Sequence, residues 1–160
     1  LERAKKDKRE GKAPSTQAGE FVREEIEHIR EGKHGARSAK QAIAIGLSKA
    51  RRAGVDLPPP EKGATSEQTR RSAASAYRAG QEGDHKVSPV RSRATTRALK
   101  REGQAAASKQ ALSRHAHAAA ADKTAADRSA AARKAVKTKG AAERSAAARK
   151  AARTRARTSG

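Results

Sequence analysis

The fold of this chain is decided by residues 21–57, which read FVREEIEHIREGKHGARSAKQAIAIGLSKARRAGVDL. Nine of the 16 large apolar side chains of the sequence (five Val, four Ile, five Leu, one Phe and one Tyr) lie in this stretch. Most other apolar residues are alanine, which buries too little surface to offset roughly 1–2 kcal/mol of backbone entropy per ordered residue. We therefore expect this stretch alone to fold by itself, without a single core that spans the whole chain.

The first predicted helix runs from about residue 16 to residue 31. Val22, Ile26 and Ile29 recur at intervals of four and three residues, which is the spacing of one helical face. The exposed side of this helix is expected to be acidic, through Glu20, Glu24, Glu25 and Glu27. Residues 32–35, Gly-Lys-His-Gly, should end the helix and turn the chain.

The second predicted helix runs from Ser38 to about Ala53. Ser38 is a suitable N-cap, and Gly54 stands where a left-handed residue commonly closes a helix. The apolar stripe of this helix consists of Ala39, Ile43, Gly46, Leu47 and Ala50. Two helices joined by a short loop predict an αα-hairpin, over which Val55 and Leu57 are expected to fold back.

The rest of the chain differs sharply in composition. We expect five segments: a basic flexible arm over residues 1–15, the helical hairpin over 16–57, a Pro-rich linker over 58–65, short basic helices over 66–103, and an Ala/Lys/Arg-rich tail over 104–160. Short helices should begin at Ser66 and at Ser88, each a hydroxyl cap, and should stop at Gly80 and Gly103. The predicted fold class is mainly α with extensive disorder and no sheet.

The tail contains an internal repeat. Residues 127–135, DRSAAARKA, recur as residues 143–151, ERSAAARKA, with an offset of 16. Alanine, arginine and lysine have high helix propensities, so helices are expected at about 108–139 and 141–157. Because nothing apolar holds these helices to a partner, we expect helicity that increases when the charge is neutralised.

The charge of the chain indicates a polyanionic partner. The net charge is +21, of which residues 61–160 contribute +16, from 24 basic and 8 acidic side chains. Charge of one sign on this scale opposes compaction unless a polyanion neutralises it. A membrane-bound helix would need Trp, Phe or Leu on one face, and no apolar run approaches the ~20 residues of a membrane span. Nucleic acid is therefore the expected partner, and a membrane is not.

The candidate binding residues are the basic side chains of the tail. Residues 104–160 hold 14 Lys or Arg and 3 acidic residues, with alanine between them. Spaced cations gain counterion-release entropy on duplex DNA, which presents a phosphate charge about every 1.7 Å of its axis. The predicted phosphate contacts are Lys109, Arg114, Lys123, Arg128, Arg133, Lys134, Lys137, Lys139, Arg144, Arg149, Lys150, Arg153, Arg155 and Arg157.

Other kinds of site find little support in the sequence. Single-stranded RNA readers stack bases on aromatic side chains, and Phe21, which we expect in the core, and Tyr77 are the only aromatic residues. His28 and His34 flank the predicted loop, with no carboxylate or thiolate set to complete a metal site. There is no cysteine, phosphate-binding glycine loop or nucleophile motif. We therefore expect no enzyme, no metal and no cofactor.

Residues 38–54, SAKQAIAIGLSKARRAG, carry a resemblance to a known family. They resemble small basic bacterial and phage proteins of unknown function that share a Lys-Gln-Ala-Ile-Ala-Ile-Ala-Leu-Ser-x-Ala-Arg segment, often behind a Lys-His-Gly loop like residues 33–35. Some of these proteins are labelled plasmid stabilisation proteins. The resemblance covers roughly residues 20–54, and Gly46 stands where alanine is usual. The tail is similar in composition to linker-histone-like bacterial proteins.

These observations predict a DNA-binding, histone-like, nucleoid-associated protein that compacts DNA without sequence preference, or a plasmid-stabilisation role with the same chemistry. Its expected location is the cytoplasm, at the nucleoid. Two alternatives stay open: an RNA- or ribosome-associated basic protein, and a protein-interaction adaptor of a plasmid-maintenance system that works through the hairpin. The hairpin could also form a homo-oligomer.

Overall fold

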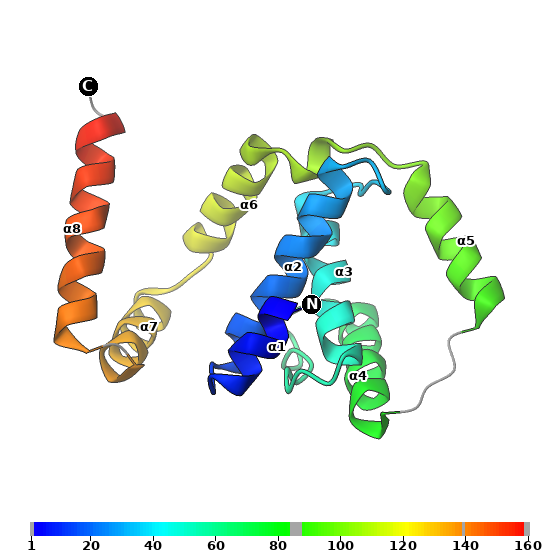
Figure 1. Cartoon of the computed structure of the whole chain (residues 1–160), viewed down its shortest axis with the longest axis horizontal. Helices are drawn as coiled ribbons and strands as arrows, with labels where there is room; N and C mark the ends of the chain where they lie inside the picture. Colours follow the sequence, from blue (N-terminus) through cyan, green and yellow to red (C-terminus); the bar gives the residue numbers. More distant parts are fainter. Residues whose placement is uncertain (1, 84–87, 139, 159–160) are drawn as a thin grey trace. The chain divides into compact units, whose positions relative to one another are not determined.

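The computed structural model describes residues 2–83, 88–138 and 140–158, in which helices are joined by turns and loops (Figure 1). The helices are α1 (Glu2–Arg9), α2 (Pro14–Arg30), α3 (Ala39–Arg52), α4 (Glu67–Glu82), α5 (Pro89–Lys100), the 3-10 helix η1 (Ala105–Ala107), α6 (Lys109–Ala121), α7 (Ala125–Thr138) and α8 (Ala141–Thr158). The predicted α class is confirmed, and no strand occurs in the described ranges. Helices also fill most of the region where extensive disorder was expected.

The chain divides into two compact units, residues 1–115 and residues 116–160. All the buried side chains belong to the first unit, and no described residue of the second unit is buried. This division agrees with the expectation that no single core spans the chain. Among the described residues, no helix is both long enough and apolar enough to span a bilayer.

The predicted hairpin is the centre of the first unit. Helices α2 and α3 pack against each other, and the Ser38 hydroxyl caps α3 by accepting a hydrogen bond from the Gln41 amide at 3.2 Å. Gly54 closes α3 with φ +78°, as its position predicted. A Cβ atom on Gly46 would lie 2.6 Å from the Val22 Cα atom, so the two helices approach each other at the level of the backbone.

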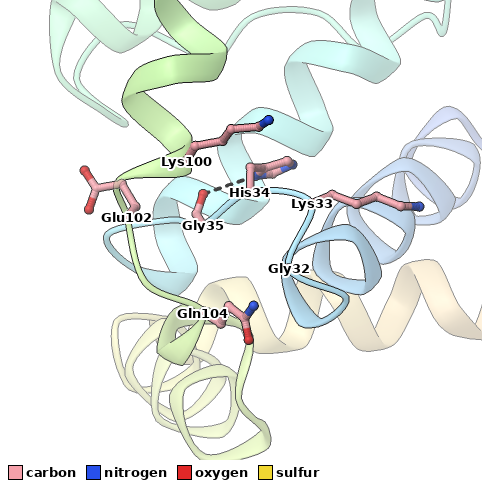
Figure 2. Close-up of a pocket in the computed structure, with 7 residues that line it drawn as sticks. All are labelled: Gly32, Lys33, His34, Gly35, Lys100, Glu102 and Gln104. Atoms are coloured by element: carbon pink, nitrogen blue, oxygen red, sulfur yellow. Dashed lines mark hydrogen bonds between the residues drawn. The ribbon is translucent and has the colours of Figure 1, made fainter.

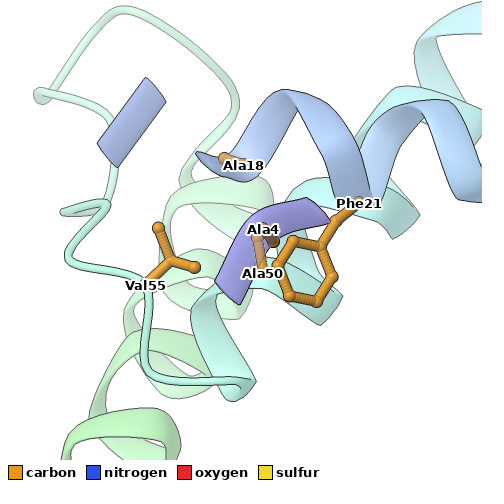
Figure 3. Close-up of a cluster of buried hydrophobic side chains, with 5 residues drawn as sticks. All are labelled: Ala4, Ala18, Phe21, Ala50 and Val55. Atoms are coloured by element: carbon orange, nitrogen blue, oxygen red, sulfur yellow. The ribbon is translucent and has the colours of Figure 1, made fainter. Parts of the chain in front are cut away.

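Two small clusters of buried side chains form the core. One cluster consists of Ala4, Ala18, Phe21, Ala50 and Val55, with Leu47 and Leu57 packed against it (Figure 3). The other consists of Ile29, Ala36, Ala42, Ala106 and Ala107, with Ile26 beside it. Residues 55–57 therefore fold back over the hairpin as expected. Most of the buried members are alanine, so the core depends on close helix contacts more than on large side chains.

The segment expected to be a flexible arm contains α1, which packs against α2. Ala4 and Asp7 of α1 are buried. The Lys12 ammonium lies 2.7 Å from the Asp7 carboxylate, and the Gln17 amide donates to the Lys12 carbonyl at 2.8 Å. These contacts explain the docking of a helix whose sequence offers alanine as its buried apolar residue.

Helix α4 packs against α3 through Gly80, where we expected the helix to end. A Cβ atom there would lie 1.8 Å from the Arg51 carbonyl oxygen, so this glycine permits a helix contact. The helix instead ends at Gly83, which has φ +74°. The Tyr77 hydroxyl donates to the Asp56 carboxylate at 2.6 Å, which raises the pKa of Tyr77 and ties α4 to the segment after α3.

Candidate nucleic-acid interface

The predicted phosphate contacts lie on exposed parts of three helices and one connection. Lys109 and Arg114 are on α6, Lys123 follows α6, four more are on α7 and six on α8, and Lys139 lies outside the described residues. Each of the described contacts is exposed. The packing of the described residues therefore covers none of these side chains.

The cations of α8 form a stripe. Arg149, Arg153 and Arg157 are spaced by four residues, so they share one helical face and are separated by about 6 Å of helix rise. In α7, Arg133 and Lys137 occupy the places that Arg149 and Arg153 hold in α8. The internal repeat thus presents the same pattern of charge on two successive helices.

Arginines at the beginning of each repeat are engaged within the chain. The Arg128 guanidinium donates to the Lys123 carbonyl at 2.8 Å. The Arg144 guanidinium donates to the Val136 carbonyl at 3.1 Å, which joins the start of α8 to the end of α7. These two side chains stabilise the turns that precede α7 and α8. The stripe of Arg149, Arg153 and Arg157 lies further along α8, away from these turns.

The single helix expected over 108–139 is divided in two, because Thr124 starts a new helix. The Asp127 amide donates to the Thr124 hydroxyl at 3.1 Å, and the Asp127 carboxylate accepts from the Thr124 amide at 3.0 Å. This reciprocal pair is a capping box. Hydrogen bonds from Thr124 lower the pKa of the Asp127 carboxyl. The helix starts follow the same repeat: α7 begins after Thr124, and α8 begins after Gly140, the residue 16 positions later.

One predicted contact lies beside cations that sequence reasoning missed. Arg114 borders a shallow pocket of about 370 Å³ at the beginning of α3, together with Arg37 and Lys40. The N-terminus of a helix carries partial positive charge, so this pocket is electropositive for two separate reasons. The Ser38 cap marks the helix start in the sequence, but nothing there shows that residues of α6 line the same pocket.

The exposed face of α3 offers little for base readout. Helix α3 carries four cations, and one of them, Arg51, is buried, and burial lowers its pKa. Its guanidinium donates to the carbonyls of Leu57 and Pro58 at 3.0 and 3.3 Å. Lys49 pairs with Glu25. Two of the four cations of α3 are thus committed to the fold, and Lys40 and Arg52 are the other two.

A buried carboxylate lies under the loop between α2 and α3. The Glu25 side chain is fully buried, whereas the sequence placed it on the exposed, acidic side of the helix. The Lys49 ammonium lies 2.5 Å from its Oε2 atom. His34 Nε2 lies 3.2 Å from its Oε1 atom. The burial of Glu25 could not be predicted from the sequence, because Lys49 belongs to α3 and His34 to the loop.

His28 joins this group from the next turn of α2. One ligand atom each from Glu25, His28 and His34 lie within 4.8 Å of one another. The sequence showed the two histidines without a carboxylate to complete a site, and Glu25 is that carboxylate. The sequence did contain a signal for this group, because the Glu-x-x-His spacing of Glu25 and His28 places both side chains on one helical face.

The same loop borders a pocket of about 440 Å³, lined by Gly32, Lys33, His34, Gly35, Lys100, Glu102 and Gln104 (Figure 2). The Gly35 amide donates to the Leu99 carbonyl at 2.9 Å, and the Ala36 amide donates to the Gly103 carbonyl at 3.0 Å. A Cβ atom on Gly35 would lie 1.9 Å from the Glu102 carbonyl oxygen. The loop is therefore held in place by backbone contacts that need glycine.

One family model matches part of the chain. Residues 8–62 match the model of a family of unknown function, DUF6496. The match confirms the expected resemblance to an uncharacterised family. No curated protein matches the chain, and no solved structure does either.

The segment that this family model matches contains α2, α3 and the loop between them, together with Glu25, His28, His34 and Lys49. The predicted phosphate contacts all lie beyond its end at residue 62. The buried carboxylate group and the cationic repeat therefore belong to different parts of the chain.

Proposed function

We propose that this protein is a non-catalytic binder of nucleic acid, chiefly double-stranded DNA, that neutralises backbone phosphates without reading the bases. The observation that supports this most is the exposed cationic stripe of α8, of which two positions, Arg149 and Arg153, are repeated in α7 as Arg133 and Lys137. A helix with arginines about 6 Å apart and alanines between them can lie close to a phosphate backbone.

The distribution of acids supports the same proposal. Residues 104–160 contain only Asp122, Asp127 and Glu143 as acidic side chains, and Asp127 is used to cap α7. The 14 basic side chains of this part therefore far outnumber its three acids, which favours binding of an external polyanion. Neutralising DNA over a long stretch favours its compaction, so the proposal extends to a histone-like role on the nucleoid or a plasmid.

The first test is the salt dependence of binding to a short DNA duplex, measured by electrophoretic mobility shift. If about 10 phosphates are contacted, the logarithm of the binding constant should fall with the logarithm of salt concentration with a slope of about −9. A slope near zero would remove the proposal. Displacement of the duplex by a smaller amount of structured RNA would instead support RNA as the ligand.

A matched pair of triple variants tests the stripe itself. Replacing Arg149, Arg153 and Arg157 by Gln removes three charges from one face of α8, and should reduce the salt slope by about 2.7. The control replaces three arginines outside the stripe: Arg128, Arg144 and Arg155. It should cost less affinity, because Arg128 and Arg144 already donate to backbone carbonyls. Equal losses would show that total charge alone determines binding.

A further inference from the structure

We propose that Glu25, His28 and His34 form a binding site for a divalent transition-metal ion of the Zn²⁺ type. The site goes beyond nucleic-acid binding and lies in a different part of the chain. Two imidazoles and one carboxylate are a ligand set that Zn²⁺ accepts, with water in the remaining position.

The first step of the argument is the state of the carboxylate. The Glu25 side chain is fully buried, and among the described residues its Oε1 atom has no hydrogen-bond partner. Lys49 occupies the other oxygen, Oε2. A buried acceptor without a partner is costly, so an Oε1 atom held in this way is disposed to accept a cation.

The second step is the tautomer of His34. Its Nδ1 atom lies 3.1 Å from the Gly35 carbonyl oxygen. A carbonyl oxygen can only accept, so this contact is a hydrogen bond when Nδ1 carries a proton. In that tautomer of the neutral ring, the lone pair on Nε2 is the one that a metal ion would take. That Nε2 atom lies 3.2 Å from Glu25 Oε1. The two atoms form an ion pair when the ring is protonated, and they present two adjacent lone pairs to a cation when it is neutral. A backbone carbonyl that fixes the second nitrogen is the usual support for a metal-bound histidine.

The third step is the rigidity of the loop. His34 precedes Gly35, whose amide is bound to the Leu99 carbonyl and whose missing Cβ makes room for the Glu102 carbonyl. The backbone beside His34 is thereby fixed before any ion arrives. Preorganised ligands lose less conformational entropy on binding.

The fourth step is access and adjustment. The side chains of His28 and His34 are 27% and 14% exposed, so the site lies at the protein surface on one side. Ligand atoms around tetrahedral Zn²⁺, with bonds of about 2.0–2.2 Å, are closer together than 4.8 Å. Rotation of the more exposed ring, His28, can close the gap, whereas Glu25 and His34 are already adjacent.

The test is a titration of the full chain with Zn²⁺, followed by competition with a chromophoric chelator. We expect saturable binding of one equivalent, and a melting temperature that rises with Zn²⁺ because the ion binds only the folded site. His28→Gln and His34→Gln should each weaken binding at least about tenfold, since losing an outer-shell partner alone costs about 10–100-fold. His28 is the safer substitution for folding, because it is partly exposed.

The chain offers a matched control in His115 and His117, which lie two residues apart on α6. The double variant His115→Gln/His117→Gln should keep the Zn²⁺ affinity and the melting shift of the wild type. Co²⁺ should give the visible ligand-field bands of a low-coordinate site in this variant and lose them in His34→Gln. Absence of saturable binding, or binding that survives in both His28→Gln and His34→Gln, would overturn the proposal.

Discussion

Single glycines determine how closely the helices of the first unit approach. Gly46 on α3 faces the Val22 backbone, and no other residue type would leave the contact unchanged. Gly19 on α2 has no neighbour within 4 Å of the place where a Cβ atom would lie. Both glycines lie inside helices, but only Gly46 has close neighbours. Substituting each by alanine therefore distinguishes the effect of packing from that of helix propensity.

We predict that Gly46→Ala destabilises the protein by roughly 1 kcal/mol, because overpacking of about 1–3 kcal/mol exceeds the propensity gain of about 1 kcal/mol. Gly19→Ala should instead stabilise it by about 1 kcal/mol. Urea unfolding followed by circular dichroism measures both changes. A stabilising Gly46→Ala would mean that α2 and α3 are not in backbone contact.

The roles of some residues could be predicted from the sequence, and those of others could not. Ser38 and Gly54 could be assigned as caps because their roles depend on neighbours in sequence. Glu25 could not be assigned as buried, since its partner Lys49 is 24 residues away and His34 comes from the loop. A carboxylate on an otherwise acidic helix is indistinguishable from its exposed neighbours until the tertiary contacts are known.

At the scale of elements, the repeat contains a natural comparison of helix caps. Helix α7 begins with the Thr124–Asp127 capping box, whereas α8 has Gly140 in the place of the threonine and Glu143 in the place of the aspartate. The two helices otherwise have similar sequences. The start of α5 at Ser88 could also be predicted from neighbours in sequence. The Ser88 hydroxyl accepts a hydrogen bond from the Arg91 amide.

We predict that Thr124→Gly weakens α7 and that Gly140→Thr, which creates a capping box with Glu143, strengthens α8. Capping contributions of this kind are a few tenths to about 1 kcal/mol relative to glycine. Far-ultraviolet circular dichroism should show less helix in the first variant and more in the second.

The cap of α7 should also depend on pH. Because the pKa of Asp127 is lowered in the folded chain, the stabilisation of α7 by the Asp127 carboxylate is present near neutral pH and is lost as the pH falls through that pKa. No change in helicity in either variant would contradict the role of the cap.

At the scale of the whole molecule, the tail does not begin where composition changes. Composition suggested a boundary at residue 104, but Ala106 and Ala107 are buried beside Ile29, and the Arg30 guanidinium donates to the Ala107 carbonyl at 2.8 Å. Alanines look alike in the sequence whether they space cations or fill a core. The helical class was therefore predictable from composition and periodicity, whereas the docking of α1 and η1 was not.

Two truncations should separate the core from the cationic helices. A chain that ends at Ala121 keeps η1 and α6, so its unfolding free energy should stay within about 0.5 kcal/mol of the full chain while DNA affinity falls. A chain that ends at Gly103 loses two buried alanines and the Arg30 hydrogen bond, and should be less stable by about 2 kcal/mol. Equal stability of the two truncations would show that η1 contributes nothing to the core.

The alanine-rich clusters of the first unit have a calorimetric consequence. Heat capacity rises on unfolding mainly because apolar surface becomes hydrated, and alanine side chains expose little of it. We therefore expect the heat-capacity increment of this chain to be smaller than the roughly 12–15 cal/mol/K per residue of ordinary globular proteins. Its curve of free energy against temperature is correspondingly flat, so cooling weakens the native state little and heating melts it over a broad range.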